Sequence, residues 1–441
     1  MSLYSSSSAY MKDTWLPVLN NQLEHSEGSL LKKLGMNYDA PTKIEGRKAF
    51  MKLQIGDDTG FGVNAQGGDF SGGGDATYDE ATLELMRFNA TITLDGHEKG
   101  LADSLSAAAA PIIQRKMANA KSRVARELER IAIMDGSGKL AKIASVSTTA
   151  ITLDVAGSDY TERNAYTWID DAYRSLYTTV DATTGADEVS DFTVSNVAES
   201  TNVLTASTSA AASSAGDFIV TGGYGSSAWT TGGAISSREF PGLLKMISSS
   251  GTYLGINRAT SGKAYWKAVE DNNSGTLRTF TETLANTLCN KLARRAEDGM
   301  VSQSDHFGIA SPGTWTSYML NMSTGIRYTV ADTPDIGWGG REMLLMNGIK
   351  LYKHIHAPRN MVLVIHTPST KFVTAKHTPS DQNLEFVTGN GGDIWFPATA
   401  SSGQGYADKW YAYITGFLGM YSERPRNNAK LDDLTETSGA Y

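Results

Sequence analysis

The sequence predicts an α+β fold with one long helix and several groups of strands. Three observations lead to this prediction: helical periodicity over 101–134, strand-like alternation on both sides of a glycine-rich stretch at 56–75, and short β-prone runs in a Ser/Thr-rich segment at 140–235. A chain of 441 residues is long enough for several compact units. We divide it into an arm (1–42), an extended β-hairpin (43–94), a long helix (95–139), an inserted β-sandwich or barrel (140–235), a main domain (236–379), a strand region (380–414), and a C-terminal strand with a tail (415–441).

The arm has apolar residues at helical spacing, but the pattern is interrupted. Leu16, Leu19 and Leu23 recur every three or four positions, and Pro17 and Gly28 break the run into short pieces. Such pieces bury little apolar surface by themselves. We therefore expect the arm to lie against another surface.

The segment 43–94 is expected to form a long hairpin from strands near 50–55 and 88–94. The second strand alternates apolar and polar residues from Phe88 to Leu94. Eight glycines within 56–75 give the connecting tip backbone freedom and no side chains for a core. Two long strands with such a tip are marginally stable alone, so we expect the hairpin to pack on a neighbouring subunit.

A helix is expected over 101–134, ending near Gly136. Its periodic apolar positions are Ile113, Met117, Ala120, Val124, Leu128 and Ile131. From Pro111 to Met134 it carries six basic and two acidic residues, in a chain whose net charge is -8. This basic excess is either a solvated face or a contact with an acidic partner, such as another subunit or an assembly factor.

Short β-prone runs separated by turn residues fill 140–235, which predicts a small antiparallel sandwich or barrel. Beyond it we expect a helix at 278–296, a strand, turn and helix at 309–322, two strands within 348–365, and a long strand at 410–421.

Several function classes are excluded by composition. A net charge of -8 argues against a basic nucleic-acid reader, because binding phosphates requires clustered Lys and Arg. The single cysteine, Cys289, cannot form an internal disulfide and is expected to be a small buried residue. No signal peptide and no apolar run long enough to span a bilayer is present in the sequence, so we expect production in the cytoplasm and no membrane contact.

The motif search predicts no catalytic, cofactor-binding or metal-binding residues. Residues 135–140 imitate part of a phosphate-binding loop, but Ile133 replaces its first glycine and Leu140 its Ser or Thr. His354 and His356 would share one face of a predicted strand, yet no spacing supplies the third ligand of a zinc site. We interpret them as exposed strand histidines.

The order of these pieces resembles the major capsid proteins of tailed double-stranded-DNA bacteriophages, whose Hong Kong 97-type fold is shared with encapsulin shells. The motifs that carry the resemblance are "FGIASPGTWT" at 307–316, "MNGIKLYKHIHAPRNMVLVI" at 346–365, and "FLGMYSERPRNNAKL" at 417–431. "DATTG" at 181–185, "AGDFIVTGG" at 215–223 and "REFPGLLKMISSSGTYLGINRAT" at 238–260 look like a subgroup with a β insertion.

This resemblance implies an L-shaped subunit. Its peripheral domain would hold 95–139 as a spine helix together with the strand region 380–414. Its axial domain would comprise 236–379 and 415–441, and the hairpin would reach across to the next subunit. We expect the intersubunit contacts to include Arg47, Phe61, Val63, Phe70, Arg87, Leu16, Leu19 and Leu23. The alternative for the tip aromatics is that they are merely exposed loop residues.

The implied function is a coat protein that self-assembles, as pentamers and hexamers, into an icosahedral shell of the virion inside the host bacterium. The shell would enclose double-stranded DNA without sequence-specific binding. Only about 40 residues precede the hairpin, so we expect a separate scaffolding protein, with a portal and a decoration protein as further partners. Lys43, Lys48 and Lys52 lie at the base of the hairpin rather than its tip, so we predict no covalent cross-link.

Three alternatives belong to other classes. An encapsulin-like cargo compartment would share the fold and differ in its contents. A β-rich surface adhesin would need a secretion signal. An enzyme would need a reactive constellation of side chains.

Overall fold

The structure is a computed structural model. It describes Leu30, Leu34, residues 63, 66 and 68, and the ranges 43–45, 48–56, 73–96, 98, 109–157, 159–171, 175–222, 230–231, 234–235, 239–295, 301, 304–325, 343–374, 385–387, 395–399 and 406–437. The chain forms two compact units. The first comprises Met1–Ala132 and Lys371–Tyr421, and the second comprises Ile133–Thr370 and Ser422–Tyr441. The predicted α+β class is confirmed, because sheets dominate both units and helices are few.

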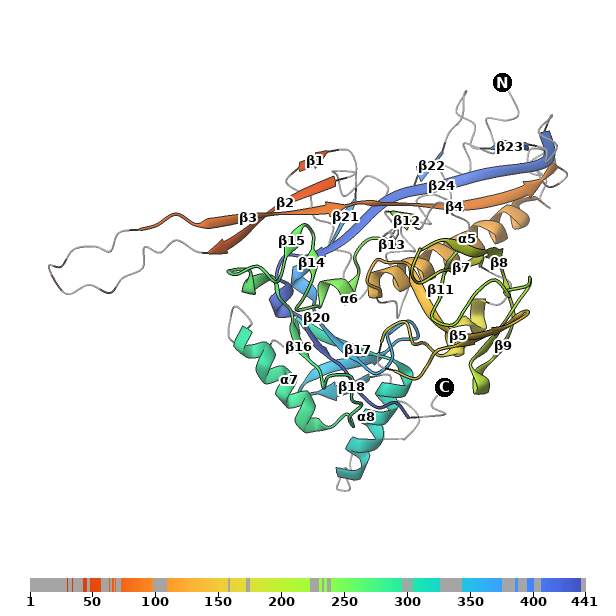
Figure 1. Ribbon diagram of the computed structural model, residues 1–441. Coiled ribbons are helices and arrows are strands. Elements are labelled where there is room, and N and C mark those ends of the chain that lie inside the picture. The colour runs from red at the N-terminus through yellow and green to blue at the C-terminus, as the bar shows by residue number, and fades with distance from the viewer. Residues whose placement is uncertain are drawn as a thin grey trace. The chain divides into compact units, whose positions relative to one another are not determined.

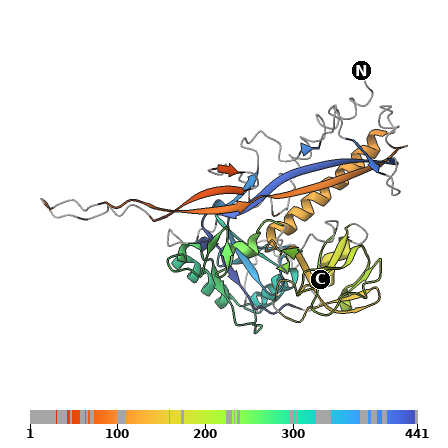
Figure 2. The ribbon, with the colours of Figure 1, turned by 45° about the horizontal axis from the view of Figure 1, so that its top comes forward.

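The first unit contains a two-stranded ribbon made by β2 (Lys48–Gly56) and β3 (Thr77–Glu84), with β1 (Lys43–Glu45) beside β2. The pairing is antiparallel and runs from Lys48↔Glu84 to Gly56↔Thr77. We use "the ribbon" below for β2 and β3. It extends beyond the end of the other long strand pair of this unit (Figure 1; Figure 2).

That second pair corrects the predicted hairpin. The strand β4 (Met86–Asp95) does not return along β2; it pairs with β24 (Tyr406–Ser422) over ten positions. The prediction was wrong because alternation of apolar and polar residues identifies a strand but not the strand with which it pairs. Both β3 and β4 show this alternation. The strand β24 also pairs with β21 (Thr370–Thr374), β22 (Glu385–Phe386) and β23 (Phe396–Thr399).

The predicted long helix is confirmed over α5 (Ala109–Ile133), and residues 101–108 of the prediction lie outside the described residues. Val124, Leu128 and Ile131 are buried, as their helical spacing requires. The chain leaves the helix through Gly136, whose φ of 85° favours glycine. A Cβ at this position would also lie 2.9 Å from the carbonyl oxygen of Phe240. None of the described helices is long and apolar enough to cross a membrane.

A seven-stranded antiparallel sheet follows α5 in the second unit, in the order β8-β7-β11-β5-β6-β10-β9. Its strands are β5 (Lys139–Ser147), β6 (Ala150–Leu153), β7 (Tyr177–Val180), β8 (Asp187–Phe192), β9 (Val194–Ala198), β10 (Val203–Ala206) and β11 (Phe218–Thr221). Only Thr193 separates the two edge strands β8 and β9 in the chain, so the sheet must curl until its edges nearly meet. We call it the curled sheet. Its interior is a core that includes Trp168, Tyr177 and Phe192.

The curled sheet lies within 140–235, where a small antiparallel sandwich or barrel was predicted, and its being an insertion stays a prediction. The runs predicted near 150–155, 176–180, 202–206 and 217–221 are β6, β7, β10 and β11. The run predicted at 192–197 splits between the end of β8 and β9, and β5 was not predicted.

The second unit also holds a six-stranded sheet in the order β16-β25-β20-β17-β19-β18. The strands are β16 (Val269–Asp271), β25 (Ala429–Leu431), β20 (Val362–His366), β17 (His306–Ala310), β19 (Ile349–Lys353) and β18 (Met343–Met346). Two helices, α7 (Glu282–Arg295) and α8 (Pro312–Gly325), share one hydrophobic core with it. Phe280 stacks on Tyr318 of α8 in this core, with ring centroids 4.2 Å apart. As predicted, Cys289 of α7 is buried, and burial raises the pKa of its thiol.

The two strands predicted within 348–365 are confirmed as β19 and β20, and β17 lies between them in the sheet. One expectation about this segment needs correction. His354 and His356 were predicted on a strand, but β19 ends at Lys353 and both lie in the following turn. The backbone N–H of His356 donates to Nδ1 of His354 over 3.2 Å.

A compact segment at 239–268 is organised around Arg258, which is fully buried. It contains α6 (Leu243–Met246) and the short pair β14 (Thr252–Tyr253) and β15 (Ile256–Asn257). The Arg258 guanidinium donates to the carbonyl oxygens of Lys245, Met246, Ser250 and Trp266. Burial lowers the pKa of Arg258, and these carbonyls take the place of water around its charge.

Candidate assembly surface

One face of the ribbon is buried in its own unit. Ala49, Met51 and Leu53 of β2 and Ala81 and Leu83 of β3 are at most 7% exposed. Ala49 lies opposite Leu83 and Met51 opposite Ala81, so the apolar side chains occupy the same side of the ladder. The base of the ribbon is therefore part of the core of the first unit.

The opposite face of the ribbon carries opposite charges in register. Lys48 lies across from Glu84, and Lys52 across from Glu80, all four exposed. Cross-strand pairs of opposite charge stabilise a sheet modestly, by about 0.2–1 kcal/mol each. These charge pairs favour the observed register of β2 against β3 and leave little net charge on this face of the ribbon.

The charged face also carries Tyr78, which lies opposite Gln54 near the distal end of the ribbon and is 63% exposed. Val63 in the connecting segment is 90% exposed. Large apolar side chains exposed at the end of a projecting element are typical of a surface that a partner covers. Val63 was a predicted contact residue. Tyr78 was not, although its place among polar neighbours in a β-prone run was a usable signal.

Of the other predicted contact residues, the structure describes Arg87. It is exposed on β4, where its Nε donates to the Thr415 hydroxyl over 3.2 Å and its guanidinium carbon lies 5.9 Å from the centre of the Phe417 ring. Arg47, Phe61, Phe70, Leu16, Leu19 and Leu23 lie outside the described residues. Leu30 and Leu34 are the described positions of the arm, and both are buried.

Part of the basic excess of α5 is neutralised inside the first unit. Lys116 forms an ion pair with Glu98 and donates to the carbonyl oxygen of Thr93, and Arg130 pairs with Glu127 over 2.9 Å. Arg123 is exposed. Both interpretations of the basic helix, solvated face and acidic partner, stay predictions.

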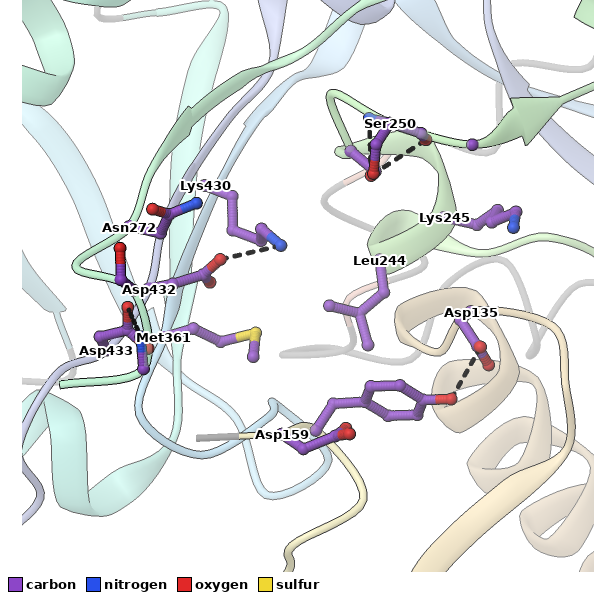
Figure 3. A pocket seen from close by; sticks show the side chains of 15 residues that line it. Asp135, Asp159, Leu244, Lys245, Ser250, Asn272, Met361, Lys430, Asp432 and Asp433 are labelled. Carbon is purple, nitrogen blue, oxygen red and sulfur yellow. Dashed lines mark hydrogen bonds and ion pairs between the residues drawn. The ribbon is translucent and has the colours of Figure 1, made fainter. Parts of the chain in front are cut away.

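A hollow of about 610 Å³ lies in the second unit (Figure 3). On one side Tyr160 donates its phenol proton to Asp135 over 2.7 Å. On the other, Lys430 pairs with Asp432 over 2.9 Å, and burial raises the pKa of Asp432 despite this partner. Asp433 accepts backbone N–H groups from residues 273 and 275. Asp135, Asp432 and Asp433 thus each accept at least one bond from the protein itself.

Three carboxylates meet at one end of the curled sheet. The ligand-type oxygens of Asp181, Glu188 and Asp217 all lie within 4.8 Å of one another. Asp217 accepts backbone N–H groups from residues 182 and 214, and Asp181 accepts two from the turn that follows it. Burial, with the hydrogen bond to Asp217 and its negative charge, raises the pKa of Glu188 to about 7. The spacing of these residues in the sequence did not reveal this cluster.

No family model matches the chain, and no curated protein matches it. Solved structures do. The chain is similar to the capsid subunit of cyanophage A-1(L), with 11% identity and a TM-score of 0.49 over 93% of this chain and 96% of that one. It is similar to the SrpI encapsulin of Synechococcus elongatus, with 9% identity and a TM-score of 0.41 over 95% of both chains. It is also similar to a chain of the satellite phage P4 procapsid, with 10% identity and a TM-score of 0.37 over 97% of this chain and 95% of that one.

The β-insertion subgroup stays a prediction.

Proposed function

We propose that this chain is the major capsid protein of a tailed phage, a subunit that self-assembles into an icosahedral shell around double-stranded DNA. The observation that carries the proposal is the ribbon. Its base is anchored in the first unit, and its distal end exposes Tyr78 and Val63. A neighbouring subunit is the partner that would cover them.

Two further observations support a structural protein over an enzyme. Around the hollow, Tyr160 donates to Asp135, Lys430 pairs with Asp432, and Asp433 accepts a backbone N–H group. The net charge of -8 fits an inner wall that encloses DNA without holding it tightly. Many weak copies of one contact can close a shell, because the contacts act together once the ring is complete.

The parts of the chain take roles within this proposal. The helix α5 is the spine of a peripheral domain, the six-stranded sheet belongs to an axial domain at the symmetry axes, and the curled sheet is the insertion. Pentamers and hexamers, a separate scaffolding protein, a portal and a decoration protein are the proposed partners. Assembly takes place in the cytoplasm of the host bacterium.

The first experiment expresses the chain alone and with neighbouring reading frames, followed by negative-stain electron microscopy. Closed or partly closed polyhedral particles are expected. A uniform monomer in the presence of a candidate scaffolding protein contradicts the proposal. Particles containing an enzyme rather than a genome would identify an encapsulin-like compartment.

A pair of variants tests the ribbon tip itself. Deletion of 56–75 and a full-length variant with Phe61, Val63 and Phe70 changed to Ser should both give folded subunits that do not close shells. Hydrogen exchange in β4 and β24 checks folding, because that ladder does not involve the tip. Normal shells from both variants would contradict the proposal that the tip contacts a neighbouring subunit.

A further inference from the structure

Arg359 occupies the turn between β19 and β20, where three separate parts of the second unit meet. Its Nη1 donates to the carbonyl oxygen of Val155 over 2.6 Å and to that of Glu162 over 3.4 Å. Its Nε donates to Oε2 of Glu436 over 2.7 Å. One guanidinium thus joins a loop of the curled sheet, the six-stranded sheet and the C-terminal tail.

Glu436 is held on its other side by the start of α8. Its Oε1 accepts hydrogen bonds from the hydroxyls of Ser311 and Thr314, and the side chain is only 5% exposed. A carboxylate at this end of a helix is also favoured by the helix dipole. The buried charges of Glu436 and Arg359 therefore neutralise each other, with the remaining oxygen satisfied by hydroxyl donors.

The tail reaches this position through its own backbone. The N–H of Leu434 donates to the carbonyl oxygen of Asn360 over 2.8 Å, and that of Thr435 to Arg278 over 2.9 Å. The N–H of Thr437 donates to the carbonyl oxygen of Gly313 over 3.4 Å. Residues 434–437, which we call the strap, are thus laid across the turn and the first turn of α8.

The same loop of the curled sheet receives two more bonds from this turn. The Asn360 amide donates to the carbonyl oxygen of Gly157 over 2.7 Å, and Arg163 donates to that of His356 over 3.3 Å. Within the curled sheet, Nζ of Lys142 on β5 forms an ion pair with Oδ2 of Asp154 in this loop, over 3.0 Å. Residues 154–157 and 159–163 therefore connect the curled sheet to the turn that holds Arg359.

We propose that Arg359 is a positioning residue that fixes the curled sheet against the six-stranded sheet, and that the strap locks it there through Glu436. The curled sheet has a core of its own, so we expect the contacts of Arg359 and Glu436 to determine its orientation rather than its folding. The orientation is therefore fixed only when the strap, residues 434–437, is in place. This inference goes beyond shell building and can be tested without shells.

The chemistry explains why arginine is needed. Its planar fork donates to Glu436 and to the Val155 carbonyl at once, in two directions. Lysine offers one ammonium at the end of a flexible stem and cannot satisfy both acceptors in the same geometry. Arg359→Lys should therefore release the loop while keeping the charge.

The test is hydrogen exchange on the purified full-length chain, comparing Arg359→Lys, Arg359→Met and Glu436→Gln with the parent. Exchange in peptides covering 154–163 is expected to rise at least tenfold in each, with β17 and β20 unchanged. Glu199→Gln and Arg294→Met, which change exposed residues of the same types, are matched controls and should leave 154–163 unchanged.

A double variant sharpens the test. Arg359→Met combined with Glu436→Gln removes both buried charges and leaves neither unpaired. Hydrogen exchange in β17 and β20 should therefore match the parent, while exchange in peptides covering 154–163 should stay raised. Parent-like exchange at 154–163 in all variants would overturn the proposal. An equal rise in β17 and β20 would overturn it too, because Arg359 would then hold the fold together rather than position one part.

Discussion

The ribbon and the curled sheet are both built from short antiparallel strands, yet they bury their apolar side chains in opposite ways. The curled sheet closes on itself and encloses Trp168, Tyr177 and Phe192 in a core of its own. The ribbon has one buried face, and its opposite face exposes Tyr78 near the distal end. A region with its own core can fold alone, whereas a region without one depends on what lies beside it.

The largest expected effect breaks the core of the curled sheet. Phe192 is fully buried, 6.1 Å from the Tyr177 ring, so Phe192→Ala removes a large side chain from a closed interior. We expect a loss of about 3–5 kcal/mol. Urea unfolding followed by hydrogen exchange in β7 and β11 measures it.

Leu176→Ala is the control, because Leu176 is an exposed apolar residue of the same region and should change stability by less than about 0.5 kcal/mol. If the curled sheet unfolds independently, the backbone amides of β4 and β24 should stay protected from hydrogen exchange in Phe192→Ala. A loss of protection in both units would mean that the curled sheet does not unfold independently.

A smaller effect concerns the proton held at Glu188. The pKa of this carboxyl is about 7 in the folded protein, against roughly 4.3 in an unfolded chain. Because the folded state binds the proton more tightly, the stabilisation is complete below about pH 4 and is lost as the pH rises through about 7. The side chain is partly exposed, so after solvent screening we expect a loss of only about 1 kcal/mol between pH 5 and pH 8.

Glu188→Gln should abolish this pH dependence, since the amide can donate to Asp217 at any pH. Denaturation of the parent and the variant at both pH values checks it, with Glu199→Gln expected to behave as the parent. If Glu188→Gln keeps the full pH dependence, the proton resides on another group.

Local features of the fold could be predicted from the sequence, whereas pairings could not. The helix α5 follows from apolar residues such as Val124 and Leu128 at helical spacing, because a helix satisfies its own backbone. The strand that pairs with β4 could not be predicted, because β24 lies more than 300 residues away in the chain. Alternation of apolar and polar residues is compatible with pairing to any other strand. The histidine pair was misplaced because the pattern does not mark that β19 ends at Lys353.

The same limit applies to the candidate sites. Val63 could be named because a glycine-rich tip leaves its side chains without a core. The contact between Arg359 and Glu436 spans 77 residues and follows no motif. The trio at Glu188 is assembled by strand pairing, so only the folded sheet brings its carboxylates together.

The smallest effect on stability, and the sharpest test of the comparison, is at Tyr78. Its side chain is 63% exposed in the subunit, so Tyr78→Ser should change the free energy of unfolding by less than about 0.5 kcal/mol. In a shell the same ring would be covered by a neighbour, where a buried aromatic can contribute about 2 kcal/mol or more to an interface. Thermal unfolding of the subunit and particle yield by electron microscopy separate the two quantities. Ile169→Ser, at an apolar residue 45% exposed in the curled-sheet region, is the matched control and should leave both unchanged. Unchanged particle yield for Tyr78→Ser would mean that the distal ribbon stays in solvent, and the two regions would then differ only in how they fold.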